Sequence, residues 1–352
     1  MPSFASKEHA PTQSHSHRDR LGRCLVVMYH YVHDSDSLSR PCSSGVTEGV
    51  CGRSVSDFCA QLDELCRRLE PTDWPALVAA MEGRESIPRE SFLLTFDDGL
   101  ADHAEVVLPM LEDRGLHGVF FVPGAVLATH KMLPAHALHL LLSTLGAAEV
   151  VGEWRSSLKE SAGSQAWLNL LDGVPGPDAV AAEALYGYES PELARLKYLV
   201  AMKLPINLRN QTIEKMFEKH VGSSARWSRH WYLGWDDLAR LESLGHTIGG
   251  HGYRHDAYAR MNAEETRDDV LRCAAVLRDG LGADRRPLSY PYGSFTEAAK
   301  SALAEAGFVH AFTTEQGWVR ADAEPFRMPR YDTIHVQAAW GKTTTCPLEQ
   351  HH

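Results

Sequence analysis

The sequence predicts an α/β protein, a distorted (β/α)7-8 barrel that carries a helical insertion. Two observations lead to this prediction. About seven short apolar runs recur along the 352-residue chain, each followed by a helix-like segment or a long excursion, which is the pattern of parallel βαβ units. Polar residues directly follow several of these runs, as in barrels that place their chemistry at the carboxyl ends of the strands.

The first part of the chain alternates strand-like and helix-like segments. The β-branched run 24–32 predicts a buried strand. The segment 56–70 has apolar residues at helical spacing behind Ser54 and Ser56, which are residue types that commonly begin helices. The strand-like run 91–96, the helix-like segment 102–115 and the strand-like run 117–123 complete this part.

The alternation breaks between residues 126 and 232, where amphipathic segments surround a Pro/Gly-rich patch at 172–178. It resumes with a helix-like segment at 235–245 and a strand-like run at 246–250. Asn262 with Glu265 three residues later predicts the start of a long helix, because this spacing resembles a capping box. The remaining elements are expected at 287–293, 296–307, 308–314 and 326–332.

These segments divide the chain into a barrel and an insertion. The barrel is expected to comprise residues 23–125 and 233–340, and the insertion, which would act as a lid, residues 126–232. Residues 1–22 are polar and rich in Ser and His, so we expect a disordered tail there. A second tail is expected at 341–352.

Composition narrows the class of partner and the compartment. A formal charge of −11 without a long Lys/Arg run argues against nucleic acid or an anionic membrane surface as the main partner. No apolar run is long enough to span a bilayer, and the amino terminus has no signal-peptide core. Seven cysteines without a C-x-x-C motif suggest free thiols. We therefore expect a cytoplasmic protein with a neutral or cationic small substrate.

Asp97 and Asp98 are adjacent carboxylates at the end of an apolar run, where they would repel each other unless a cation lies nearby. His251 and His255 stand four residues apart in a glycine-rich segment that also follows an apolar run. Both imidazoles can point the same way at this spacing. Two histidines and one aspartate form a set that holds zinc or a similar divalent ion and leaves positions for water and substrate.

The motifs TFDDG, HGYRH and YPYG occur in this order, and together they resemble those of the NodB-homology polysaccharide deacetylases, carbohydrate esterase family four. An early Y-H pair, at His30, resembles the poly-N-acetylglucosamine deacetylase branch. The resemblance implies a distorted barrel and a metal-dependent hydrolase that removes acetyl groups from N-acetylated sugars, acting on non-peptide C–N bonds. It implies Zn²⁺ as the favoured ion, with Co²⁺, Mn²⁺ or Ni²⁺ as alternatives.

The resemblance also implies roles for individual residues. Asp97 would be the general base, and Asp98 would bind the metal together with His251 and His255. The backbone N–H of Tyr292 would stabilise the developing oxyanion, and Pro291 would fix the turn that carries it. Chemistry supports this division of labour, because an amide is a poor electrophile and its hydrolysis needs a Lewis acid, an activated water and a proton for the departing amine.

Two positions depart from the family pattern. The late L-x-H motif that supplies the general acid is represented only by TIH, which ends at His335, so we favour His30 as the acid. The family's arginine, two residues before the proline, is Ser289 here. We expect Arg330, at the end of the last strand-like run, to orient Asp97 in its place.

Several functional alternatives keep the same motifs. The absence of an export signal favours an N-acetylated sugar or glycan precursor in the cytosol, such as a nucleotide sugar, a lipid-linked precursor or a free amino-sugar derivative. One alternative is a metal-dependent amidohydrolase that acts on a non-sugar amide or imide. Another is a non-catalytic sugar-binding relative. An iron oxygenase is disfavoured, because its triad generally occurs on antiparallel sandwiches.

Overall fold

The computed structural model describes residues 21–34, 52–159, 164–187, 189–282, 285–320 and 322–340. The first strand, β1, begins at Leu21, so Leu21 and Gly22 of the expected amino-terminal tail belong to a strand. The rest of that tail and the expected tail at 341–352 lie outside the described residues.

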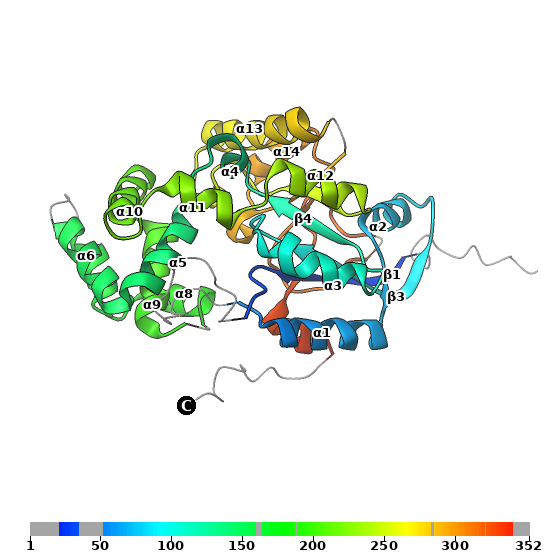
Figure 1. Cartoon of the computed structure of the whole chain (residues 1–352), viewed down its shortest axis with the longest axis horizontal. Coiled ribbons are helices and arrows are strands. Elements are labelled where there is room, and N and C mark those ends of the chain that lie inside the picture. Colours follow the sequence, from blue (N-terminus) through cyan, green and yellow to red (C-terminus); the bar gives the residue numbers. More distant parts are fainter. Residues whose placement is uncertain are drawn as a thin grey trace, which may run out of the picture.

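A parallel sheet forms the centre of the molecule, with the strand order β7-β6-β5-β4-β3-β1-β8. The short strand β2 pairs with β3 beside this path. The strands are β1 (Leu21–Tyr29), β2 (Glu70–Pro71), β3 (Ile87–Phe96), β4 (Gly118–Val122), β5 (Thr247–Gly250), β6 (Pro287–Ser289), β7 (His310–Phe312) and β8 (Tyr331–Asp332). The sheet curls into a distorted, barrel-like layer with helices packed around it, which confirms the predicted fold class (Figure 1).

The central strands are apolar on both faces because both faces are covered. Every residue of β4 is buried, as are Cys24–Tyr29 of β1. The register sets Phe96 of β3 beside Phe120 of β4, and their rings stack with centroids 4.8 Å apart. Such continuous apolar runs are typical of parallel sheets that lie between helices.

Helices follow the strands where the sequence provides start signals. The side chain of Ser54 caps α1 (Val55–Arg68), and Asn262 forms a capping box with Glu265 at α13 (Ala263–Leu281). The segment after β3 contains a π-helical turn, η3 (His103–Val107), before α3 (Leu108–Glu112). The other helices packed around the sheet are α2 (Trp74–Met81), α12 (Trp235–Ser243) and α14 (Glu297–Ala306).

A long helical excursion separates β4 from β5. Figure 1 shows most helices of this excursion gathered beside the sheet rather than on its faces, while the first of them, α4, lies next to α13. They are α4 (Gly124–Thr129), α5 (Pro134–Leu145), α6 (Ala147–Lys159), α7 (Gln165–Leu171), α8 (Pro177–Leu185), α9 (Pro191–Tyr198), the π-helical turn η4 (Leu199–Lys203), α10 (Ile206–His220) and α11 (Ser224–Trp231). Within the described part of the chain, no helix has both the length and the apolarity needed to cross a bilayer.

Candidate active site

A cavity of about 590 Å³ lies at the carboxyl ends of the strands. Its walls come from two parts of the chain, the strand ends and the helices α5, α8, α9 and α10 of the excursion. Of the residues predicted for the site, six line it: His30, Asp97, Asp98, His251, His255 and Tyr292. The helical excursion is therefore part of the site.

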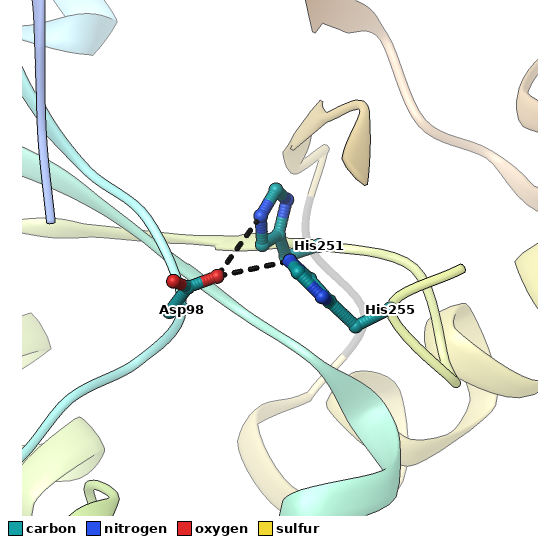
Figure 2. Close-up of side chains that lie close together, drawn as sticks. All are labelled: Asp98, His251 and His255. Carbon is teal, nitrogen blue, oxygen red and sulfur yellow. Dashed lines mark ion pairs between the residues drawn. The ribbon is translucent and has the colours of Figure 1, made fainter. Parts of the chain in front are cut away.

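Asp98, His251 and His255 converge on one point in this cavity. One ligating atom from each lies within 4.8 Å of the others, and all three residues are buried. Oδ1 of Asp98 is 3.3 Å from Nε2 of His251 and 3.0 Å from Nε2 of His255. Figure 2 shows the carboxylate of Asp98 pointing between the two imidazoles, which come from the loop after β5.

The backbone at this point adopts conformations that L-residues rarely take. Asp98 has φ of 75°, His255 of 58° and Tyr292 of 57°. Left-handed conformations at non-glycine residues cost free energy, and they tend to persist where the surrounding structure enforces them for function. Among the described residues, four that are not glycine have a positive φ, and three of these four belong to this site.

The contacts of His251 fix which of its nitrogens is available to a metal. Nδ1 lies 2.8 Å from the carbonyl oxygen of Ser289, to which only a protonated nitrogen can donate. This leaves Nε2 as the lone-pair nitrogen, directed at Asp98. Burial opposes protonation of His251, but the carboxylates of Asp97 and Asp98 outweigh it and raise its pKa.

The environment of Asp98 suits a ligand carboxylate. Burial raises its pKa, but His255 and His136 outweigh this and hold the pKa well below the ordinary range, so the group is ionised. Among the described residues, its buried Oδ1 accepts no hydrogen bond of normal geometry. An ionised oxygen without a donor, beside two imidazole nitrogens, fits a divalent cation such as Zn²⁺. These three residues would hold it.

Asp97 is held by a fully buried arginine. Nη1 and Nη2 of Arg330 donate to Oδ1 and Oδ2 of Asp97, each at 2.8 Å. The hydroxyl of Ser289 accepts from Nη2 of Arg330 at 2.7 Å and donates to Oδ2 of Asp97 at 2.9 Å. Burial raises the pKa of Asp97, but Arg330 and His251 lower it below its usual range. Arg330 thus forms a bidentate pair with Asp97. That Arg330 orients Asp97 as the catalytic base stays a prediction.

Two residues of the helical excursion that the motifs did not single out also reach the site. His136 of α5 is buried, and its Nε2 lies 3.1 Å from Oδ2 of Asp98. Its Nδ1 lies 2.6 Å from the hydroxyl of Tyr232. The available signal was a pair of histidines, His136 and His139, within an otherwise apolar helix.

Sequence and fold comparisons agree with this geometry. The sequence model of the family described as Polysaccharide deacetylase matches residues 208–311. No curated protein sequence matches the chain. The fold is similar to that of IcaB from Ammonifex degensii (TM-score 0.53, 18% identity, covering 92% of this chain and 100% of that one). It is also similar to a Streptococcus pyogenes deacetylase, PplD, solved with acetate (0.52, 12%, 88% and 92%), and to a de-N-acetylase from Aggregatibacter actinomycetemcomitans (0.52, 16%, 88% and 94%).

Residues 208–311 match the polysaccharide deacetylase family model, which supports the resemblance to the NodB-homology deacetylases. The family match extends from α10 into β7 and includes both histidines of the HGYRH motif, while the fold similarity extends over most of the chain. The prediction of a carbohydrate deacetylase-type hydrolase is therefore confirmed.

Both candidates for the general acid face the cavity. His30 directly follows β1, and His335 lies on the 3₁₀ helix η7 (Thr333–Trp340) after β8. The backbone carbonyl of His30 accepts a hydrogen bond from Nε2 of His103 at 3.0 Å, which anchors the segment that presents the imidazole. His30 as the acid stays a prediction.

Proposed function

We propose that this protein is a divalent-metal-dependent hydrolase that removes an acetyl group from an N-acetylated sugar or glycan precursor. The observation that carries the proposal is a single cavity holding both a metal-type ligand set, with Asp98 at its centre, and a second carboxylate, Asp97, fixed by Arg330. One carboxylate would bind the cation and the other would accept a proton. Two adjacent aspartates with separate partners can serve both purposes.

The chain's own residues divide the reaction among them. A bound divalent ion would supply Lewis acidity and activate water. Asp97 would accept the proton of the attacking water, and Arg330 would keep its carboxylate in the productive orientation. The N–H of Tyr292, in the turn begun by Pro291, would donate to the developing oxyanion, an effect worth ~3 kcal/mol in other enzymes. His30 would then protonate the leaving amine.

The identity of the acetylated compound, which donates its acetyl group to water, rests on the family resemblance and the cavity. A sugar fits a cavity lined by both polar strand ends and apolar helix residues, including Leu138, Leu185 and Val200. The preference for a precursor over a finished polymer follows from the expected cytoplasmic location, which stays a prediction of the sequence. The alternative function, an amidohydrolase that acts on a non-sugar amide, would use the same metal chemistry and would differ from the proposed function only in its substrate. The non-catalytic sugar-binding relative is separated from it by turnover.

An acetate-release screen tests the proposal. The protein, stripped with chelator and reloaded with Zn²⁺ or Co²⁺, would be offered UDP-linked, lipid-linked and free N-acetyl sugars beside acetylated and cyclic non-sugar amides. Release from an N-acetyl sugar that disappears in Asp97→Asn and falls in His30→Ala is the expected result. Turnover confined to the non-sugar amides would favour the amidohydrolase. Absence of turnover with every compound and both metals would favour the binding relative.

A further inference from the structure

We propose that His136 and Tyr232 position the metal-ligating carboxylate, so that the helical excursion between β4 and β5 sets the metal affinity of the site. This inference rests on the proposed function, because it takes Asp98, His251 and His255 as the ligand set. It concerns residues outside the three sequence motifs. Its basis is an unbroken chain of hydrogen bonds from the backbone of the excursion to the second oxygen of Asp98.

The hydrogen bonds determine the position of each proton. The backbone N–H of Leu133 donates to the hydroxyl oxygen of Tyr232 at 3.0 Å. The single hydroxyl proton of Tyr232 is then free to point at Nδ1 of His136, 2.6 Å away. The ionised carboxylate of Asp98 can only accept, so Nε2 of His136 carries a proton and donates to its Oδ2 at 3.1 Å. A ring whose Nε2 carries a proton cannot itself ligate a metal through that atom.

The two oxygens of Asp98 consequently have different tasks. Oδ2 is tied to His136, whereas Oδ1 faces His251 and His255. Rotation of the carboxylate would exchange these oxygens and break the bond to His136. A hydrogen bond to the non-ligating oxygen is the kind of outer contact that orients a ligand, and its loss typically weakens metal binding by ~10- to 100-fold.

The excursion is anchored to the loop that carries Asp98. Where the chain leaves α11, the N–H of Leu233 donates to the carbonyl of Gly99 at 2.8 Å. In return, the N–H of Ala101 donates to the carbonyl of Trp231 at 2.9 Å. This antiparallel bridge places Tyr232 between its two bonds and directly beside the left-handed turn at Asp98 and Gly99. The exit of the excursion thus supports both the backbone and the side chain of the ligand.

A second contact ties the excursion to the histidine ligands. Nη1 of Arg209, on α10, lies 2.6 Å from Oδ1 of Asp256, and both side chains are buried. Asp256 directly follows His255, whose φ is positive. The aspartate ligand and the histidine loop therefore both contact the helices of the excursion. A shift of these helices would displace both parts of the ligand set.

Metal affinity measured without substrate tests the inference. Co²⁺ would be titrated by calorimetry into the chelator-stripped full chain and its variants, with circular dichroism and thermal melts to confirm folding. Asp98→Asn provides the background from histidines elsewhere in the chain. His139→Ala is the matched control, because His139 is on the same helix one turn away and pairs with Tyr31 rather than a ligand.

We expect His136→Ala to weaken Co²⁺ binding by ~10-fold or more. His136→Gln should recover part of the affinity, because its amide nitrogen can donate to Asp98. The Co²⁺ affinity of Tyr232→Phe should lie between those of wild type and His136→Ala. This variant removes the hydroxyl that bonds to Nδ1 of His136 but keeps the imidazole that donates to Asp98. A simple packing role would lower the melting temperature without this order of affinities.

Wild-type affinity in folded His136→Ala, with binding lost in Asp98→Asn, would overturn the inference and leave the proposed function standing. Wild-type affinity in Asp98→Asn as well would show that the ligand set is wrong, and the proposed function would fall with the inference. If the variants show the expected order of Co²⁺ affinities but the protein releases no acetate, the inference is supported and the proposed N-acetylated substrate is contradicted.

Discussion

Replacing Arg330 by alanine should damage both stability and catalysis, for separable reasons. Arg330 is fully buried, and its guanidinium donates to Asp97 twice, to the hydroxyls of Ser289 and Thr95 at 2.7 and 3.1 Å, and to the carbonyl of Thr313 at 3.1 Å. Removing one partner of a buried ion pair costs about 3–5 kcal/mol, because the other charge is left uncompensated. Urea unfolding of Arg330→Ala should show a loss of that order.

The catalytic effect should appear in the pH profile. Arg330 lowers the pKa of Asp97 against the effect of burial, so its removal raises that pKa. A general base must be ionised to act, and the acid limb of kcat/KM should therefore move to higher pH in Arg330→Ala. Loss of the bidentate clamp should also lower kcat by ~100-fold, the typical effect of a misplaced catalytic group. Initial rates of acetate release from pH 4 to 9 measure both effects.

Two variants isolate the cause. Arg330→Lys keeps the charge but loses the bidentate geometry, so its acid limb should stay near that of wild type while kcat falls. Arg286→Ala removes another buried arginine, which pairs with Glu242 and bonds to the carbonyl of Ile248 away from the cavity. It should lose stability with an unshifted profile. Undiminished kcat and an unmoved acid limb in Arg330→Ala would refute the orienting role.

Three further predictions concern the acid, the ion and buried imidazoles. His30→Ala should lower kcat by ~10²- to 10⁴-fold, whereas His335→Ala should leave kcat near that of wild type; the opposite result would reassign the acid. Chelator treatment should abolish acetate release and lower the melting temperature, with both restored by Zn²⁺ in wild type and neither in Asp98→Asn, because an ion bound only to the native state stabilises it. Burial lowers the pKa of His103 to about 4. The unfolded chain takes up this proton near pH 6.5, so between pH 6.5 and 4 the free energy of unfolding should fall by ~1.4 kcal/mol per pH unit from this group. His103→Gln, compared with wild type in urea titrations across that range, should lose this part of the slope, and an unchanged slope would contradict the assignment.

The sequence was a good guide where the signal is local. The capping box at Asn262 involves residues three apart, and the spacing of His251 and His255 is set within one short loop. It was a weaker guide to short strands. β8 has only two residues, and Pro329 just before it has no N–H to donate to a ladder. β2, also two residues long, is too short for any periodicity to show.

The contacts made by the helical excursion could not be predicted in this way. His136 meets Asp98 across 38 residues of sequence, and Tyr232 meets His136 across 96. A histidine on an apolar helix face is compatible with core packing and with a functional contact alike, because burial alone requires only that its nitrogens find partners. Which partners it finds depends on how the whole excursion packs over the strand ends.

Ser289 stands where the family that the sequence resembles has an arginine, and its pairing with Arg330 depends on the shape of the barrel. Ser289 is on β6, three places from β3 in one direction, and Arg330 leads into β8, two places from β3 in the other. Five strand spacings of ~4.8 Å would separate them by ~24 Å in a flat sheet. Their side chains nevertheless meet at 2.7 Å around Asp97, at the end of β3, so the sheet must curl until its two wings converge on the base. A serine at position 289 fits this arrangement, because its short side chain bonds to the guanidinium and the carboxylate at once and leaves the centre to an arginine from the opposite wing. The bidentate pair therefore helps to hold the barrel together as well as to orient Asp97. For this reason, its removal should change both the free energy of unfolding and the pH profile of kcat/KM.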